Sequence, residues 1–170
     1  GSFRGSRAQA VAELRERFDH ALTGHLLSDV PVGLFLSAGI DSAAIASVCR
    51  RVGRAIESWT FSFAERGEPD ETAVAIRTAG HFGFPHRVVT WSPASLAADV
   101  GRFAVNMDQP SVDGFNTWLM ARACRQFNHK VALSGLGGDE LFGGYVGLGR
   151  IPALYRANRA ASFFPDFAKR

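Results

Sequence analysis

The chain has 170 residues, of which 46% are hydrophobic and 21% are charged, and its formal net charge is +3. The length suits one domain, and the composition excludes a disordered chain and, since no apolar run of about 18 residues occurs, a membrane span. The basic excess lies in residues 147–170, whereas residues 1–146 are nearly neutral. We therefore expect no nucleic-acid partner and no membrane partner.

The two cysteines, Cys49 and Cys124, lie far apart and form no C-x-x-C pair. This spacing favours neither a zinc site nor a redox couple and is typical of a reducing compartment. The amino end shows no charged-then-apolar export signal. We therefore expect a cytoplasmic protein.

The apolar spacing predicts helices and strands that alternate along the chain. The first half is predicted to form a helix at 8–27, a strand at 32–36, a helix from Ser42 that stops at Gly53, and a strand at 56–63. The second half is predicted to form a helix at 70–83, a strand at 86–90, helices at 94–105 and 113–127, and a strand at 130–133. Ser92 and Pro93 are a good cap and first-turn pair for the helix at 94–105. This order indicates an α/β fold, a doubly wound parallel sheet with helices on both faces.

Residues 36–42, LSAGIDS, join the first predicted strand to the next helix. Ligands of open α/β sheets bind beyond the carboxyl ends of the strands, and the first turn of a helix offers N–H groups to an anion. Ser37 and Ser42 add hydroxyl donors and Gly39 permits close approach, so the segment predicts a phosphate site. Asp41 would repel a phosphate unless Mg²⁺ lay between them. The alternative is an ordinary turn with Asp41 or Ser37 as the helix cap.

Residues 133–145, LSGLGGDELFGGY, again lead from a predicted strand into a helical turn. Their many glycines disfavour a helix and therefore indicate close backbone approach or unusual dihedral angles. Asp139 follows this strand as Asp41 follows the first one. If the first and fourth strands are neighbours, as in the commonest doubly wound order, both aspartates face one crevice. Two carboxylates and two glycine loops at one cleft are typical of a magnesium–nucleotide site.

The first loop resembles the pyrophosphate loop, Ser-Gly-Gly-x-Asp-Ser, of the N-type ATP pyrophosphatases. The second is similar to the signature of the synthetase domain of asparagine synthetases, a family that includes β-lactam-forming and lasso-peptide-forming cyclases. Further landmarks agree, namely SDVPVG at 28–33, DE at 70–71 and DQP at 108–110. The resemblance covers roughly residues 10–146 and implies an adenine-nucleotide alpha-hydrolase-like fold.

The resemblance also implies roles for individual residues. ATP would bind with its β,γ-pyrophosphate on the first loop and its adenine at the ends of the first two strands, in contact with Phe35, Ser37, Ala38, Gly39, Ile40, Asp41, Ser42, Phe63, Ser134 and Gly135. Asp41 and Asp139 would hold Mg²⁺, and with Glu140 they would form the catalytic set. A carboxylate, of aspartate or an analogue, would attack the α-phosphorus, release pyrophosphate and form an acyl-adenylate that ammonia or another amine captures.

The chain departs from the family pattern in several places. Ala38 replaces the first loop glycine, which indicates a backbone there compatible with negative φ, and Gln109 replaces a usual acid. The glutaminase domain, expected in the parent protein, and the later part of the synthetase domain with its essential lysine are missing. We therefore expect an ATP-pyrophosphatase core at 1–149, the start of an absent carboxyl-terminal half at 150–170, and an inactive chain.

Two alternatives stay open. One is another pyrophosphatase relative, such as a tRNA-modifying or NAD-synthesising enzyme, although the second loop argues against it. The other is a non-catalytic nucleotide-binding fragment or interaction module whose partner covers the apolar Phe163, Phe164 and Phe167. A homodimer would also cover these phenylalanines.

Overall fold

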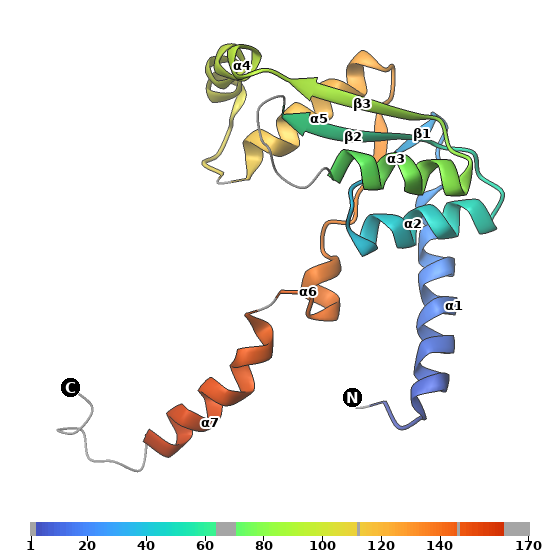
Figure 1. Cartoon of the computed structure of the whole chain (residues 1–170), viewed down its shortest axis with the longest axis vertical. Coiled ribbons are helices and arrows are strands. Elements are labelled where there is room, and N and C mark those ends of the chain that lie inside the picture. The colour runs from blue at the N-terminus through green and yellow to red at the C-terminus, as the bar shows by residue number, and fades with distance from the viewer. Residues whose placement is uncertain (1–2, 64–70, 112, 146, 162–170) are drawn as a thin grey trace. The chain divides into compact units, whose positions relative to one another are not determined.

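A computed structural model of the chain describes residues 3–63, 71–111, 113–145 and 147–161. The strands are β1 (Val32–Phe35), β2 (Glu57–Phe63), β3 (His86–Trp91) and β4 (Val131–Leu133). The helices are α1 (Arg7–His25), α2 (Ile40–Arg51), α3 (Glu71–Phe82), α4 (Pro93–Asn106), α5 (Gly114–Gln126), α6 (Gly138–Phe142) and α7 (Ile151–Ala161), with a 3₁₀ turn at Leu148–Arg150. Figure 1 shows these elements along the chain.

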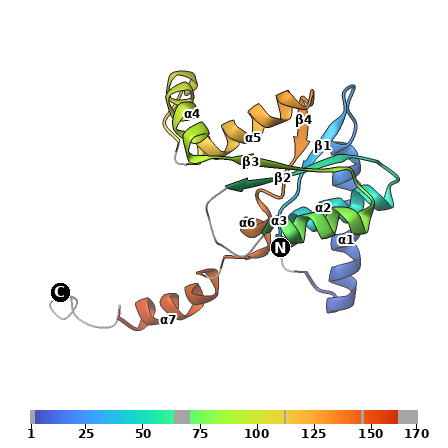
Figure 2. The same cartoon turned by 45° about the horizontal axis from the view of Figure 1, so that its top comes forward.

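The four strands form one parallel sheet in the order β3-β2-β1-β4. Leu34 of β1 pairs with Leu133 of β4 and with Ser58 of β2, so the carboxyl ends of these strands lie at the same edge. Helices α2 and α3 lie on one side of the sheet and α5 on the other (Figure 2). The predicted α/β fold, the parallel sheet and the neighbouring first and fourth strands are confirmed.

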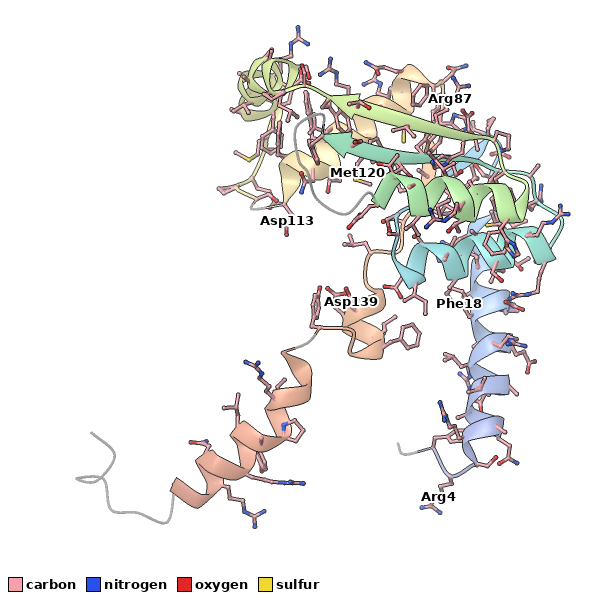
Figure 3. All side chains as sticks on the ribbon, in the orientation of Figure 1. Arg4, Phe18, Arg87, Asp113, Met120 and Asp139 are labelled. Atoms are coloured by element: carbon pink, nitrogen blue, oxygen red, sulfur yellow. The ribbon has the colours of Figure 1, made fainter. Side chains whose placement is uncertain are left out.

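One face of the sheet packs against α1, α2 and α3. Leu34 and Leu36 from the first strand and its end are fully buried there, together with Ile45 and Val48 of α2 and Ala75 of α3. Phe18 of α1 packs against the same core (Figure 3). Because side chains alternate along a strand, the residues between these leucines face the other way.

The opposite face carries a run of aromatic contacts. Phe35 lies 6.0 Å from Trp59 and 5.5 Å from Phe61, measured between ring centroids. Trp59 stacks on Phe127, just beyond α5, at 6.0 Å, and a Cβ atom on Gly33 would fall within its ring. Glycine at position 33 therefore lets a fully buried tryptophan lie flat on the first strand.

The helix ends follow local chemistry. Ser92 caps α4 by accepting the N–H of Ser95 at 3.2 Å, and Pro93 takes the first helical position, as predicted. Gly53 and Gly83, beyond α2 and α3, have φ of 72° and 71°, which favours glycine at these stops. Helix α2 begins at Ile40, two residues before the predicted start at Ser42. The prediction relied on apolar spacing, and the first turn shows none because Ile40 is 82% exposed.

Helices α4 and α5 are joined by a buried charge. Asp99 of α4 is 3% exposed and forms an ion pair with Arg122 of α5, while Arg102 lies 3.7 Å away. The Arg122 guanidinium also stands over the Trp118 ring, at 5.7 Å from its centroid. A carboxylate buried to this extent requires such a partner.

The chain forms two compact units, Gly1–Gly135 and Leu136–Arg170. The second unit holds α6 and α7, and Ile151, Leu154 and Tyr155 of α7 are all more than half exposed. The expected division of the chain into 1–149 and 150–170 stays a prediction, and the three phenylalanines near the end lie outside the described residues. No described helix has both the length and the apolar character needed to cross a membrane.

Candidate functional site

The predicted phosphate loop lies at the carboxyl edge of the sheet, between β1 and α2. Its first anchor is Leu36, whose N–H donates to the Trp59 carbonyl at 2.8 Å. The buried hydroxyl of Thr60 donates to the Leu36 carbonyl at 2.5 Å. Thr60 therefore fixes the residue that enters the loop. Thr60 was not identified from the sequence, although a hydroxyl among the aromatic residues of 59–63 could have indicated it.

The loop is held in shape by Ser42. This side chain is buried, and its oxygen accepts the N–H of Ser37 at 3.2 Å and donates to the Gly39 carbonyl at 3.0 Å. The Ser37 hydroxyl lies 3.1 Å from the Ser42 hydroxyl and accepts the N–H of Gly39 at 3.1 Å. The structure engages both hydroxyls inside the loop, and their expected donation to a ligand stays a prediction.

The first turn of α2 has no side-chain cap. Gly39 is its N-cap residue and provides no side-chain bond, so neither Asp41 nor Ser37 caps the helix. By helix geometry, the N–H groups of Ile40, Asp41 and Ser42 have no acceptor within the helix. These donors and the positive end of the helix dipole form the kind of surface that binds phosphate oxygens.

The backbone of the loop explains why alanine is tolerated at position 38. Among the described residues, Asn128 is the one non-glycine residue with a positive φ, so Ala38 has the negative φ expected from the sequence. Gly39 has φ of −73°, which any residue can adopt, but a Cβ atom there would lie 3.2 Å from the Ser37 hydroxyl oxygen. Glycine at position 39 therefore serves close approach rather than an unusual dihedral angle.

The second loop meets the first at Gly135. A Cβ atom on Gly135 would lie 3.0 Å from the Asp41 Cβ and 3.0 Å from the Ser42 backbone nitrogen. Pairing of β1 with β4 brings these loops together, since Ser134 directly follows the last residue of β4. The structure thus brings together the predicted nucleotide contacts of the two loops, namely Ser37, Ala38, Gly39, Ile40, Asp41, Ser42, Ser134 and Gly135. Their roles toward a nucleotide stay predictions.

Asp139 and Glu140, two of the three predicted catalytic residues, lie in the first turn of α6, in the second compact unit, where Figure 3 labels Asp139. Gly137 and Gly143 flank this helix with φ of 93° and 71°, so its glycines do supply left-handed backbone. The Tyr145 hydroxyl donates to Glu140 at 2.6 Å, and this bond lowers the pKa of the exposed Glu140 carboxyl. The predicted sharing of a cation by Asp139 and Asp41 stays a prediction.

The two predicted adenine contacts end their strands. Phe35 is the last residue of β1 and is half-buried, and Phe63 is the last residue of β2 and is 41% exposed. The Phe63 ring lies 6.1 Å from that of Trp91 at the end of β3. Both backbones lie at the carboxyl edge, where ligands of such sheets bind, and their contact with adenine stays a prediction.

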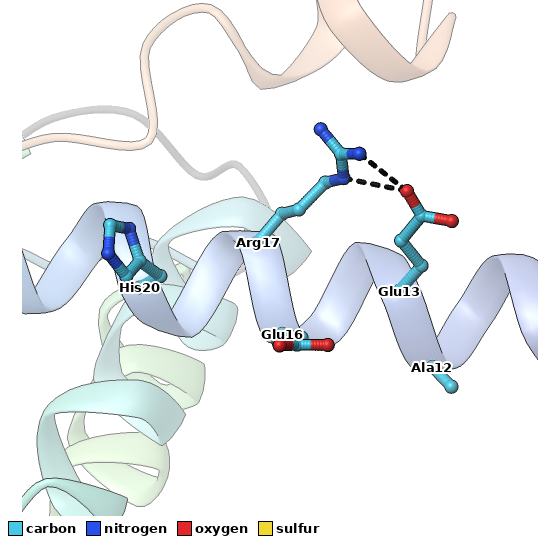
Figure 4. Close-up of a pocket in the computed structure, with 5 residues that line it drawn as sticks. All are labelled: Ala12, Glu13, Glu16, Arg17 and His20. Carbon is cyan, nitrogen blue, oxygen red and sulfur yellow. Dashed lines mark hydrogen bonds and ion pairs between the residues drawn. The ribbon is translucent and has the colours of Figure 1, made fainter.

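A hollow along α1 offers no comparable chemistry. Its lining comes from one helix, and the Glu13 carboxylate accepts two bonds from Arg17, at 2.9 Å and 2.5 Å (Figure 4). The positive charge of Arg17 is thus already balanced by Glu13. The described residues also contain no group of three His, Cys, Asp or Glu side chains that could hold a metal ion.

Comparison with known proteins agrees with the two loops. The family profile described as asparagine synthase matches residues 13–168. Asparagine synthetase [glutamine-hydrolyzing] 1 of Bacillus subtilis is 34% identical over 137 residues, which are 79% of this chain and 21% of that protein. Asparagine synthetase B [glutamine-hydrolyzing] of Escherichia coli is 29% identical over 156 residues, which are 82% of this chain and 28% of that protein. The chain thus spans about a fifth to a quarter of the length of these relatives.

Among solved structures, the NH3-dependent NAD synthetase from Campylobacter jejuni in complex with the nitrate ion is similar with a TM-score of 0.51. The match covers 78% of this chain and 59% of that chain at 15% sequence identity. At this identity the likeness concerns the fold alone. It supports a parallel α/β sheet of the type expected for an adenine-nucleotide alpha-hydrolase-like domain.

Proposed function

This chain belongs to the asparagine synthase family, and on that premise we propose that it is the ATP-binding core of an amide-forming ligase. The observation that carries the proposal is the preformed loop before α2. Its first-turn N–H groups have no side-chain cap, its two serines fix the backbone, and Gly135 of the second loop lies against Asp41. The β,γ-pyrophosphate of ATP binds to these N–H groups, because aligned backbone donors stabilise negative charge without moving.

The reaction joins a carboxylate to an amine. A carboxylate oxygen of an aspartate-like acid attacks the α-phosphorus of ATP, the bond to the bridging oxygen breaks, and pyrophosphate leaves. The amine, or ammonia, then attacks the acyl carbon and AMP leaves with the former carboxylate oxygen. The contribution of this chain is to hold the triphosphate in line and to balance the charge of the leaving pyrophosphate.

Magnesium is the cation that this site suits. Asp41 lies in the first turn of α2, and among the described residues its carboxylate makes no ion pair or hydrogen bond, so both oxygens are available. Mg²⁺ prefers one or two carboxylates together with phosphate oxygens, and Asp139 is the second ligand that we propose. When bound, the ion would neutralise charge on the phosphates.

The names of the relatives suggest the source of the amine. They are glutamine-hydrolysing enzymes, so we propose that a glutaminase domain supplies ammonia in the protein to which this chain belongs. We also propose a homodimer, which would cover the apolar Phe163, Phe164 and Phe167, and a cytoplasmic location, which the spacing of the two cysteines favours.

Calorimetric titration of the chain with MgATP tests the nucleotide site. We expect binding that Asp41→Asn weakens at least about ten-fold, since removal of the carboxylate charge weakens the metal–phosphate bridge. Asp29→Asn removes the same charge from an exposed residue before β1 and should leave the affinity unchanged. Release of pyrophosphate from MgATP in the presence of aspartate tests the ligase step separately. Absence of MgATP binding at millimolar concentration would overturn the proposal.

A further inference from the structure

A groove of about 330 Å³ lies between α5 and the edge of the sheet that β4 forms. From α5 it is lined by Thr117, Ala121, Cys124 and Arg125, whose spacing places them on one side of the helix. Its volume lies at the lower end of the range of small-molecule sites, about 300–1,000 Å³. The groove belongs entirely to the first compact unit.

Small side chains create this space. Ala132 of β4 and Ala121 of α5 both line it, and neither fills the gap between the edge strand and the helix. Gly33 pairs with Ala132 in the sheet, and the ring of Trp59 already covers that glycine. As an edge strand, β4 leaves the outer side of the groove open.

The inner wall of the groove is apolar. Cys124 is 6% exposed, and Phe35 and Ala132 are half-buried. Burial raises the pKa of the Cys124 thiol to about 11, so this side chain is neutral near pH 7. An apolar ring or short chain would remove this surface from water.

The outer part of the groove is basic. Arg125 and Lys130 are exposed, and among the described residues neither makes an ion pair. His129, also in the lining, is held by a 2.9 Å bond between its Nδ1 and the Phe127 carbonyl. No acidic residue lines the groove, and the nearby Glu57 pairs with Arg87 through one carboxylate oxygen while its other oxygen lies 4.0 Å from the His129 Nε2. The charge of this rim is therefore complementary to an anion.

The groove shares Phe35 with the proposed nucleotide site, but its basic rim lies elsewhere. His129 and Lys130 precede β4, so the basic rim lies at the amino end of that strand, whereas the 37–42 loop lies beyond the carboxyl end of β1. We propose that the groove binds a second, small amphipathic anion, an aromatic or short aliphatic carboxylate. Its apolar part contacts Phe35 and Cys124, and its carboxylate lies at Arg125 and Lys130.

The probe is 2-naphthoate, compared by calorimetry with its neutral analogue 2-naphthamide. We expect 2-naphthoate to bind about ten-fold more tightly, because a charge-assisted bond forms with the rim. Arg125→Gln combined with Lys130→Gln should abolish this difference. Arg54→Gln combined with Arg77→Gln removes two positive charges from exposed residues outside the groove and should preserve it. Equal affinity of the two probes for the unmodified chain would overturn the proposal.

A filling variant tests the place of binding. Ala121 is exposed, so Ala121→Trp should fold and should reduce the affinity of both probes at least about ten-fold by occupying the groove. Asn116→Trp adds the same ring to an exposed position of α5 outside the lining and is the matched control. Unchanged affinity in Ala121→Trp would overturn the proposal.

Two further readouts distinguish a small anion from other occupants of the groove. Saturating 2-naphthoate should slow alkylation of Cys124, identified by mass spectrometry, but not that of Cys49, which is buried on the other side of the sheet. Arg125, Lys130 and Ala121 are not among the proposed nucleotide contacts, so loss of probe binding in their variants is independent of the proposed ligase function. If 2-naphthoate binds only as a dimer of the chain dissociates, the groove is a self-association surface and the small-anion proposal fails.

Discussion

Gly135 lies so close to Asp41 that a Cβ atom on the glycine would stand 3.0 Å from the aspartate Cβ. The two residues are far apart in the chain, and pairing of β1 with β4 brings them together. The start of α2 and the end of β4 thus share one small space, in which the proposed phosphate site is built. A substitution at either residue should therefore alter the position of the other.

Gly135→Ala should destabilise the fold by about 1–3 kcal/mol, because the added methyl group would stand 3.0 Å from both the Asp41 Cβ and the Ser42 backbone nitrogen. Urea denaturation followed by circular dichroism measures this change. Gly80→Ala is the matched control, since a Cβ atom at that α3 position meets no atom within 4 Å and should stabilise the helix by about 0.5–1 kcal/mol. Equal denaturation midpoints for Gly135→Ala and the unmodified chain would contradict the steric role of Gly135.

Ser42→Ala should cost about 1–3 kcal/mol, because it leaves the Ser37 N–H and the Gly39 carbonyl without the partner that shapes the loop. It should also weaken binding of MgATP under conditions in which the variant is fully folded. Ser47→Ala, one turn further along α2, removes a hydroxyl that only accepts a 2.7 Å bond from the exposed Arg51 and should change stability by less than about 0.5 kcal/mol. If Ser42→Ala also changed the stability by less than about 0.5 kcal/mol, the loop would tolerate loss of its internal hydrogen bonds, contrary to this prediction.

Arg122→Met should destabilise the chain by about 3 kcal/mol, because it leaves the Asp99 carboxylate buried with only the more distant Arg102. Arg102→Met, which removes an exposed partner of the same carboxylate, should cost less than about 1 kcal/mol. Chemical denaturation of the two variants measures the difference. Adding Asp99→Asn to Arg122→Met should recover part of the loss, and no recovery would contradict a penalty from the unpaired charge.

The chain should lose stability in mild acid through His86. Burial lowers the pKa of this imidazole from its ordinary 6.5, and its Nε2 is buried without a hydrogen-bond partner among the described residues. The unfolded chain therefore takes up a proton more readily than the folded chain as the pH falls below about 6.5, so the free energy of unfolding decreases. Urea denaturation at pH 7.5 and 5.5 measures this decrease.

His86→Asn should reduce the dependence on pH, because the amide does not titrate and can still bond to the Ser58 hydroxyl that now lies 2.9 Å from the imidazole Nδ1. His20→Asn removes an exposed imidazole from α1 and should leave the dependence unchanged. An equal loss of stability on acidification in His86→Asn would assign the effect to other groups.

Local patterns predicted the elements closely. Ser92 and Pro93 begin α4, and Gly53 and Gly83 follow α2 and α3, because caps and stops depend on the residues at the helix end itself. The apolar spacing predicts the start of α2 two residues too late, because this spacing begins only after the first turn of the helix. The two glycine loops were also found from the sequence, since a cluster of glycines directly after a buried strand favours neither a helix nor a packed core.

The alternating α/β order and the family could be predicted from the sequence, because each depends on patterns within a few neighbouring residues, and the parallel sheet follows from that order. The turn of Ser42 into the loop, the contact of Gly135 with Asp41, and the ion pair of Arg122 with the buried Asp99 appear only in the folded chain. These relationships depend on strand order and on packing between helices. Contacts between residues far apart in the chain leave no periodic pattern in the sequence, so they could not be predicted from it.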